Sequence, residues 1–137
     1  MAALARVSSD PLDLTAHLAA VQDPACGAVV TFVGQVRDHD PDADGEVTGI
    51  EYSAHPDAER ILTELAEQAE AGGARVAVSH RIGALAVGDL ALVACVATAH
   101  RAHAYEVSRE LVERIKAELP VWKRQAQADG RTSWVGI

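Results

Sequence analysis

Two long apolar runs constrain the fold of this chain more than any other feature. "GAVVTFVGQVR" spans Gly27–Arg37 and "DLALVACVATA" spans Asp89–Ala99, and apolar side chains make up most of both. A continuous apolar run predicts a strand whose two faces are both covered by protein. We therefore expect both segments in the interior of a β-sheet.

The rest of the chain is predicted to form helices and further strands. Predicted helices span Asp10–Gln22, Pro56–Gly73 and Arg101–Leu119, and further strands are predicted over Glu46–Ala54, Arg75–Gly83 and the end of "ADGRTSWV". These bounds are supported by prolines at helix starts, by a Gly-Gly pair at the end of the second helix and by a proline after the third. The order implies strand hairpins joined by helices, which is typical of an α+β fold with a largely antiparallel sheet and helices on one side. The length predicts a single domain over residues 1–137.

Composition excludes some partners. The formal net charge is -8, whereas nucleic-acid binding requires a broad basic surface, so no nucleic acid is expected as a partner. No run approaches the roughly 20 apolar residues of a membrane span, and the first residues lack a signal-peptide pattern, so no membrane partner is expected. Two cysteines, Cys26 and Cys95, are too few for a disulfide framework, which predicts a cytoplasmic location.

One acidic segment has the spacing of an EF-hand calcium loop, with matching residues Asp40, Asp42, Asp44, Gly45 and Glu51. An EF-hand loop joins two helices, however, and this segment joins two predicted strands. We therefore favour a solvated acidic hairpin loop, and a calcium-binding module stays as an alternative function. The histidines form no metalloprotease-type pair, so no metal site is predicted.

Two basic positions lie at ends of the apolar strands. His100 and Arg101 fall where the second strand ends and the last helix begins, and a helix N-terminus with an adjacent arginine favours a phosphate or carboxylate. Arg37 follows the first strand after Gly34. A solvated corner and an exposed strand end are the alternative interpretations of these positions.

Lysine is scarce in this chain. There are ten arginines but only two lysines, Lys116 and Lys123, on either side of Pro120. Arginine stays protonated in proteins, whereas a lysine that is partly buried or beside another cation can lose its proton. The two lysines are therefore candidates for chemistry that needs an amine. Their alternative roles are a helix-end cation for Lys116 and a surface charge for Lys123.

Several segments together resemble a known family. In order along the chain they are "TFVGQVRDH", "IEYSAHPDA", "HRIGALAVGD", "AHRAHAYE", "IKAELPVWKRQ" and "DGRTSWV". They cover most of the chain, and their combination resembles the MoaE family, the large subunits of molybdopterin synthase. This resemblance implies an α/β hammerhead fold, an α+β arrangement.

The resemblance also implies an activity and partners. Members of the family transfer sulfur to cyclic pyranopterin monophosphate (precursor Z), which forms the dithiolene of molybdopterin in molybdenum cofactor biosynthesis. The sulfur arrives as a thiocarboxylate on the C-terminal Gly-Gly tail of a small ubiquitin-like subunit. Two large subunits form a homodimer at the centre of a heterotetramer, and no cofactor is expected. A non-catalytic regulatory domain that binds a small anion is the alternative function.

The same resemblance implies the site residues. The expected catalytic residues are Lys116 and Lys123. The expected substrate contacts are Gln35, Val36, Arg37, His100, Arg101, Lys116, Lys123, Arg124 and Gln125. The chain departs from the common family pattern at Gln35, where a basic residue is frequent, at Tyr105, where phenylalanine is usual, and at Gln125, where glutamate is common.

Overall fold

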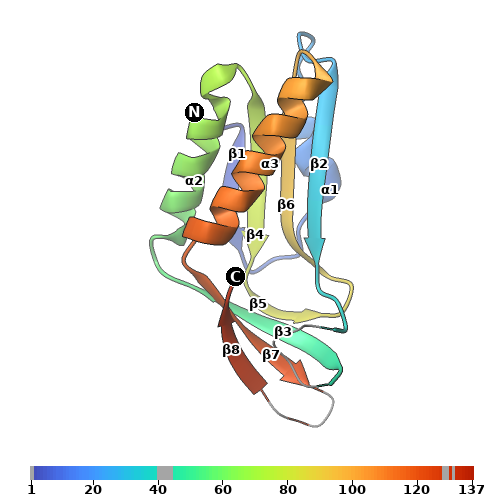
Figure 1. The fold of residues 1–137 in the computed structure, drawn as a ribbon, viewed down its shortest axis with the longest axis vertical. Coiled ribbons are helices and arrows are strands. Elements are labelled where there is room, and N and C mark those ends of the chain that lie inside the picture. Colours follow the sequence, from blue (N-terminus) through green and yellow to red (C-terminus); the bar gives the residue numbers. More distant parts are fainter. Residues whose placement is uncertain (1, 40–44, 128–129, 131) are drawn as a thin grey trace.

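Two four-stranded sheets and three α-helices make up the part of the chain that the computed structural model describes, residues 2–39, 45–127, 130 and 132–137 (Figure 1). In chain order the elements are β1 (Leu4–Ser8), α1 (Leu14–Ala20), β2 (Ala28–Gln35), β3 (Val47–Ala54), α2 (Ala58–Ala69), the 3-10 helix η1 (Glu70–Gly72), β4 (Arg75–Arg81), β5 (Gly83–Ala86), β6 (Leu90–Thr98), α3 (Arg101–Glu118), β7 (Val121–Gln127) and β8 (Thr132–Gly136).

The first sheet has the strand order β1-β4-β6-β2. β6 pairs antiparallel with both β4 and β2, whereas β1 runs parallel to β4. In Figure 1, α2 and α3 lie across the front of this sheet and α1 lies behind it. The burial agrees, because Val76 and Val78 pack in the cluster that includes the residues of α2 and α3, whereas Ala77 packs in a separate cluster with Val21 and Leu14.

The second sheet has the order β5-β3-β7-β8 and is antiparallel throughout. It lies beyond the lower end of the first sheet in Figure 1, where the C-terminal end of α3 points toward it. Val47 and Ile50 of this sheet belong to the same apolar cluster as Leu92 of β6 and Ile115 of α3. The two sheets therefore share one core at the place where they meet.

The last helix follows its apolar stripe. Ala104, Ser108, Leu111 and Ile115 recur every three or four residues and are buried, so one face of α3 packs on the sheet. Ile115 has no exposed surface, and truncation of such a residue to alanine typically costs about 2–5 kcal/mol of stability. This packing fixes the position of the C-terminal part of α3, which carries Lys116.

The predicted α+β class and the mostly antiparallel pairing are confirmed. Three details of the prediction are wrong. The strands form two sheets and not one, α1 covers the face opposite α2 and α3, and β2 is an edge strand and not an interior one. Val29 on β2 keeps 48% of its surface exposed. An apolar run indicates that a strand can be covered on both faces, but it does not state what covers it.

Three strands and one helix start also differ from the prediction. β1, β5 and β7 were not predicted, because each is short or follows directly on another element. The first helix begins after Asp13, whose side chain accepts a hydrogen bond from the amide of Ala16 at 3.1 Å, and not at Asp10. In the described part of the chain, no helix has the length and apolar character needed to cross a membrane.

Candidate active site

A pocket of about 260 Å³ lies where the two sheets meet the C-terminal part of α3. The residues that line it are Gly34, Gln35, Val36, Arg37, Val47, Ile50, Tyr52, Ala91, Leu92, Lys116 and Lys123. Among these described residues three are basic and none is acidic. Five of the residues predicted from the sequence therefore come together here, from β2, α3 and β7.

The end of β2 is held in place by backbone contacts. The amide of Val36 donates to the carbonyl oxygen of Asp89 at 3.0 Å, and the amide of Gly88 donates to the carbonyl oxygen of Val36 at 2.7 Å. The pairing of β2 with β6 shifts register between Gly34 and Gln35. The chain therefore bends out of the strand at a fixed point, and the next residue, Arg37, reaches the pocket.

A tight chain reversal brings the two lysines to the same pocket. Helix α3 ends with the amide of Leu119 donating to the carbonyl oxygen of Ile115 at 2.9 Å. The carbonyl oxygen of Pro120 accepts from the amide of His55 at 3.0 Å, which ties the turn to the end of β3. Strand β7 then runs back along β3. Lys116 thus faces the pocket from the helix and Lys123 from the sheet.

The surroundings of Lys116 lower its pKa. Lys116 keeps part of its surface in solvent, yet burial of its ammonium group lowers its pKa below the ordinary value of lysine, and the positive charge of Lys123 lowers it further. Both effects disfavour the protonated form. A lower pKa raises the fraction of neutral amine, which is the form of lysine that acts as a base or a nucleophile.

An aromatic residue that the sequence analysis did not select also lines this pocket. Tyr52 is opposite Lys123 in the pairing of β3 with β7, and it is 9% exposed. Its ring meets the ring of His80 edge-on, with centroids 5.0 Å apart and planes at 76°. The alternation of "EVTGIEYSA" puts Ile50 and Tyr52 on one face of the strand, but only the sheet pairing shows which residue Tyr52 faces.

The partner of the Tyr52 ring, His80, is in the interior of the first sheet. It is 1% exposed and lies on β4, between β1 and β6. Burial lowers its pKa to about 4, the hydrogen bond to the carbonyl oxygen of Arg81 opposes this shift, and the charge of Lys116 adds to it. At neutral pH the imidazole behind the pocket is therefore uncharged.

Arg124 and Gln125 are not among the described residues that line the pocket. Arg124 points to the other face of the second sheet, where it donates to Glu51 at 2.9 Å and lies over the ring of Trp134 at 5.4 Å. Gln125 is on the same face of β7 as Lys123 but is fully buried, opposite Ile50. Both residues are therefore next to the pocket and not in it.

His100 and Arg101 are at the opposite end of α3. His100 is the N-cap of the helix, and the hydroxyl of Thr98 donates to its carbonyl oxygen at 2.6 Å. Arg101 precedes Lys116 by fifteen residues of continuous helix, which is roughly 22 Å at the usual helical rise. The side chains of His100 and Arg101 therefore do not reach the lysine pocket of their own chain.

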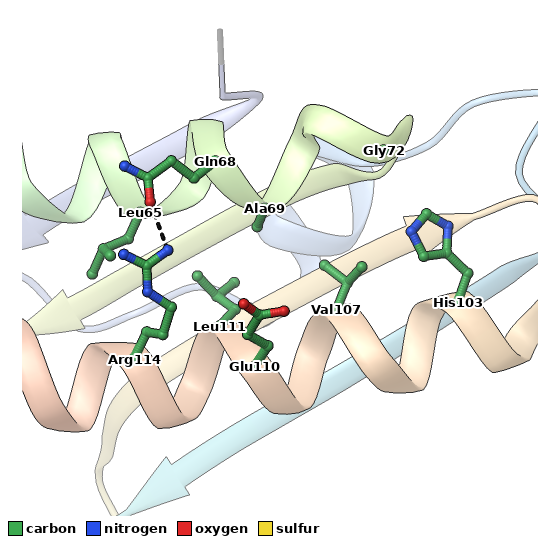
Figure 2. A pocket seen from close by; sticks show the side chains of 9 residues that line it. All are labelled: Leu65, Gln68, Ala69, Gly72, His103, Val107, Glu110, Leu111 and Arg114. Carbon is green, nitrogen blue, oxygen red and sulfur yellow. Dashed lines mark hydrogen bonds between the residues drawn. The ribbon is translucent and has the colours of Figure 1, made fainter.

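A second pocket, of about 210 Å³, lies between α2 and α3 (Figure 2). Its one arginine, Arg114, donates to Gln68 at 2.6 Å and to Glu118 at 2.8 Å, so it is already paired. Figure 2 shows Val107 and Leu111 on its floor, with His103 at one end. Because no lysine lines it, this groove does not offer the amine that the first pocket has.

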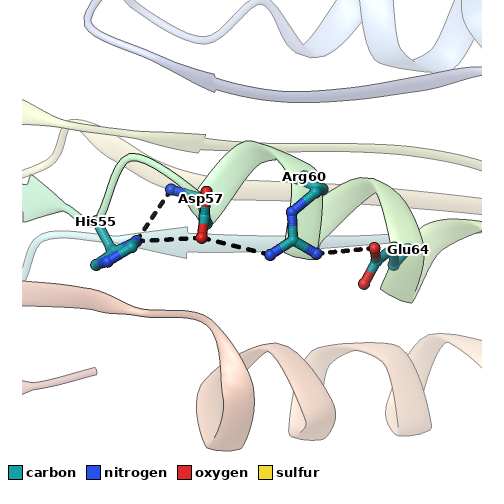
Figure 3. Close-up of polar contacts among 4 residues, drawn as sticks. All are labelled: His55, Asp57, Arg60 and Glu64. Atoms are coloured by element: carbon teal, nitrogen blue, oxygen red, sulfur yellow. Dashed lines mark hydrogen bonds and ion pairs between the residues drawn. The ribbon is translucent and has the colours of Figure 1, made fainter.

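A row of polar contacts marks the start of α2 (Figure 3). Asp57 pairs with Arg60 at 3.4 Å, Arg60 pairs with Glu64 at 2.9 Å, and His55 lies 3.9 Å from Asp57. All four side chains are more than half exposed, and such surface pairs contribute little each. We assign them to the helix surface and not to a site.

The calcium pattern gains no support. Asp40, Asp42 and Asp44 lie outside the described residues. Glu51 lies within β3, where its side chain pairs with Arg124. In the part of the chain that the structure describes, no three histidine, cysteine or acidic side chains cluster in a way that could hold a metal ion.

Sequence comparisons identify relatives of this chain. The family model described as MoaE protein matches residues 7–118. Molybdopterin synthase catalytic subunit 1 of Mycobacterium tuberculosis is 41% identical over 134 residues, which are 96% of this chain and 89% of that protein. The molybdopterin synthase catalytic subunit of Bacillus subtilis is 34% identical over 95% of this chain and 83% of its own length.

Solved structures agree with the sequence relatives. The crystal structure of molybdopterin synthase from Staphylococcus aureus matches with a TM-score of 0.88 at 30% identity, over 100% of this chain and 99% of that one. A complex of subunits 1 and 2 of the molybdopterin-converting factor from Helicobacter pylori shares the fold, with a TM-score of 0.77 at 22% identity over 98% and 90% of the two chains. This chain belongs to the MoaE family of molybdopterin synthase catalytic subunits.

Proposed function

We propose that the lysine pocket is the place where this chain transfers sulfur to a pterin phosphate. The observation that carries the proposal is the presence of Lys116 and Lys123 on two walls of one pocket, with Arg37 at its rim and no acidic residue among the described lining. A phosphate and a thiocarboxylate are both anions. A pocket with this lining can hold both, although the whole chain is acidic.

The residues have separate tasks in this proposal. Arg37 binds the phosphate of the pterin, because a guanidinium offers two parallel donors to an oxyanion. Lys116 and Lys123 work at the carbons that receive sulfur, and the lowered pKa of Lys116 suits it to accept a proton. Gln35 and Val36 form the wall beside Arg37.

The sulfur source in this proposal is the thiocarboxylate at the C-terminal Gly-Gly tail of a small ubiquitin-like subunit. The Helicobacter pylori protein of the same fold is in a complex of two different subunits. Each thiocarboxylate gives up one sulfur and leaves as a carboxylate, so one dithiolene consumes two of them. An extended tail of two glycines is narrow enough to enter a pocket of about 260 Å³.

His100 and Arg101 join this site in our proposal from a second copy of the chain. β2 is an edge strand that starts beside Ala99, next to His100, and ends at the pocket. Its eight residues span roughly 24 Å, about the distance along α3 between Arg101 and Lys116. Antiparallel pairing of two such edges about a two-fold axis would place His100 and Arg101 of one copy near the pocket of the other.

The proposed location of this activity is the cytoplasm. Cys26 and Cys95 are both free thiols, which suits a reducing compartment. Neither cysteine supplies the transferred sulfur in this proposal, because the donor sulfur comes from the small subunit.

Reconstitution tests the proposal directly. The chain is mixed with a thiocarboxylated small subunit and precursor Z, and formation of the dithiolene product is followed. The same mixture with a small subunit that ends in an ordinary carboxylate is the control. Product in the first mixture only supports sulfur transfer, whereas anion binding without product in either would favour the regulatory anion-binding domain.

A further inference from the structure

Tyr52 and Lys123 form a cross-strand pair on the pocket side of the second sheet. They are directly opposite each other in the antiparallel pairing of β3 with β7, and both line the pocket. The Cβ atoms of such a pair are about 4.5–5.5 Å apart, so a tyrosine ring is within reach of the aliphatic stem of a facing lysine. The direction of Lys123 therefore depends on where the ring of Tyr52 is held.

His80 fixes that ring. The two rings meet edge to face, with centroids 5.0 Å apart. The Nδ1 atom of His80 lies 2.8 Å from the carbonyl oxygen of Arg81, and because a carbonyl only accepts, Nδ1 carries the hydrogen. The imidazole is almost fully buried on a strand that has neighbours on both sides. It cannot turn without breaking this hydrogen bond inside the core.

These contacts connect the rigid first sheet to the pocket. The backbone of Arg81 holds His80, the ring of His80 meets the ring of Tyr52, and Tyr52 is directly opposite Lys123 in the strand pairing. A lysine has several rotatable bonds and loses side-chain entropy when it is fixed. A rigid aromatic wall removes part of that freedom before substrate arrives, and a misplacement of about 1 Å can cost as much as 10²-fold in rate.

We propose that Tyr52, held by His80, is a positioning residue that orients Lys123 for sulfur transfer. The proposal rests on the function assigned to the pocket above. The ring is the part of Tyr52 that meets His80, so we assign the positioning role to the ring. Phenylalanine should therefore replace Tyr52 without large loss, and an aliphatic residue should not.

The ionisable groups around the pocket come from five elements in the described part of the chain. Arg37 follows β2, Tyr52 is on β3, Lys116 on α3 and Lys123 on β7, with His80 of β4 behind Tyr52. A change in the aromatic wall moves Lys123 relative to the other cations, so it should change the dependence of rate on pH. Loss of stability alone would not move a pH profile measured on folded protein.

The first test compares Tyr52→Leu with Tyr52→Phe in the reconstituted sulfur transfer. Tyr52→Leu should lower kcat at least tenfold, change KM for precursor Z less than about threefold, and shift the pH profile, as expected for lost orientation without lost binding. Tyr52→Phe should stay within about threefold of the unchanged chain in kcat. Equal kcat and equal pH profiles for the leucine variant and the unchanged chain would overturn the proposal.

A second test needs no sulfur transfer. Because the chain has only two lysines, reductive methylation with ¹³C-formaldehyde adds one pair of NMR signals besides that of the N-terminus. In Tyr52→Leu the Lys123 signal should move and sharpen, which reports a freer side chain, whereas in Tyr52→Phe it should stay in place. A Lys123→Arg variant assigns the signal. An unchanged Lys123 signal in the leucine variant would also overturn the proposal.

A third variant covers the case in which Tyr52→Leu does not fold. His80→Gln leaves Tyr52 in place but removes the ring that holds it, and its Lys123 signal should shift in the same direction. Melting curves establish that each variant is folded before it is compared. If the unchanged chain transfers no sulfur, the proposed function fails, and the NMR comparison still decides whether Tyr52 positions Lys123.

Discussion

Lys116 on α3 and Lys123 on β7 line the same pocket, although the chain reverses at Pro120 between them. The reversal is fixed by the hydrogen bond from the amide of His55 to the carbonyl oxygen of Pro120. The pKa of Lys116 is lowered by burial and by the positive charge of Lys123. This arrangement raises the fraction of neutral amine available for chemistry.

Arginine substitutions separate the charge of each lysine from its chemistry. Lys123→Arg keeps the positive charge and nearly the same reach, but arginine does not give up its proton. If Lys123 acts as a free amine, single-turnover sulfur transfer should fall by roughly 10²-fold or more, while binding of partner and precursor stays close to normal. Lys123→Ala is the matched control that also removes the charge.

The same pair of substitutions at Lys116 shows whether the two lysines share one role. Because the pKa of Lys116 is lowered, Lys116→Arg should lose a large share of the activity if proton transfer limits the rate. A Lys116→Arg enzyme with nearly unchanged turnover would leave electrostatic stabilisation as the task of Lys116.

Mixed dimers test whether His100 and Arg101 act on the neighbouring pocket. Arg101→Ala and Lys123→Ala should each be poorly active alone. In a dimer that contains one copy of each variant, one pocket has its own Lys123 and receives an intact Arg101 from the other copy. Random mixing makes about half of the dimers mixed, and one of the two pockets in each is complete, so about a quarter of the normal activity should return. Mixing without any recovery would place Arg101 outside the partner's site.

The two cysteines should differ in reactivity. Cys95 is fully buried on β6, and burial raises the pKa of its thiol, with the Thr31 hydroxyl at 3.5 Å opposing part of that shift. Cys26 is partly exposed. Iodoacetamide on the folded chain should therefore alkylate Cys26 and leave Cys95 unmodified, as mass spectrometry of the peptides would show.

A cysteine substitution tests the assignment of the sulfur source. Cys26→Ser should leave sulfur transfer unchanged, because the proposal takes the sulfur from the small subunit and not from this chain. Loss of transfer in Cys26→Ser, with normal binding of the partner, would show that a thiol of this chain takes part.

The local elements were largely predictable from the sequence. The stripe of α3, the Gly-Gly end of α2 and the strand pattern of "EVTGIEYSA" depend on neighbours within a few residues, and all three elements form close to the predicted bounds. β1 was not predictable in this way, since its five residues become a strand only by parallel pairing with β4, and the paired residues, such as Leu4 and Ala77, are far apart in the sequence. Long-range pairing leaves little local signal.

The candidate site was predictable only in part, for the same reason. Arg37, Lys116 and Lys123 were selected from strand ends and lysine scarcity, and the fold brings them together. Tyr52 was missed because its role depends on the register of β3 against β7. His100 and Arg101 lie at the other end of α3 from Lys116. The sequence alone does not show how far apart such residues are in the folded chain.

Acid should destabilise this chain through His80. Burial lowers the pKa of His80 to about 4, whereas an unfolded histidine titrates at 6.5. Between these values the unfolded chain binds the proton more tightly, so the free energy of unfolding should fall as the pH falls from 6.5 to 4. The full contribution of His80 is about 3 kcal/mol. Urea titrations at pH 7 and pH 4.5 measure it, with His80→Gln as the control. The variant should lose less stability between these two pH values than the unchanged chain, and an equal loss in both would show that His80 is not buried in its neutral form.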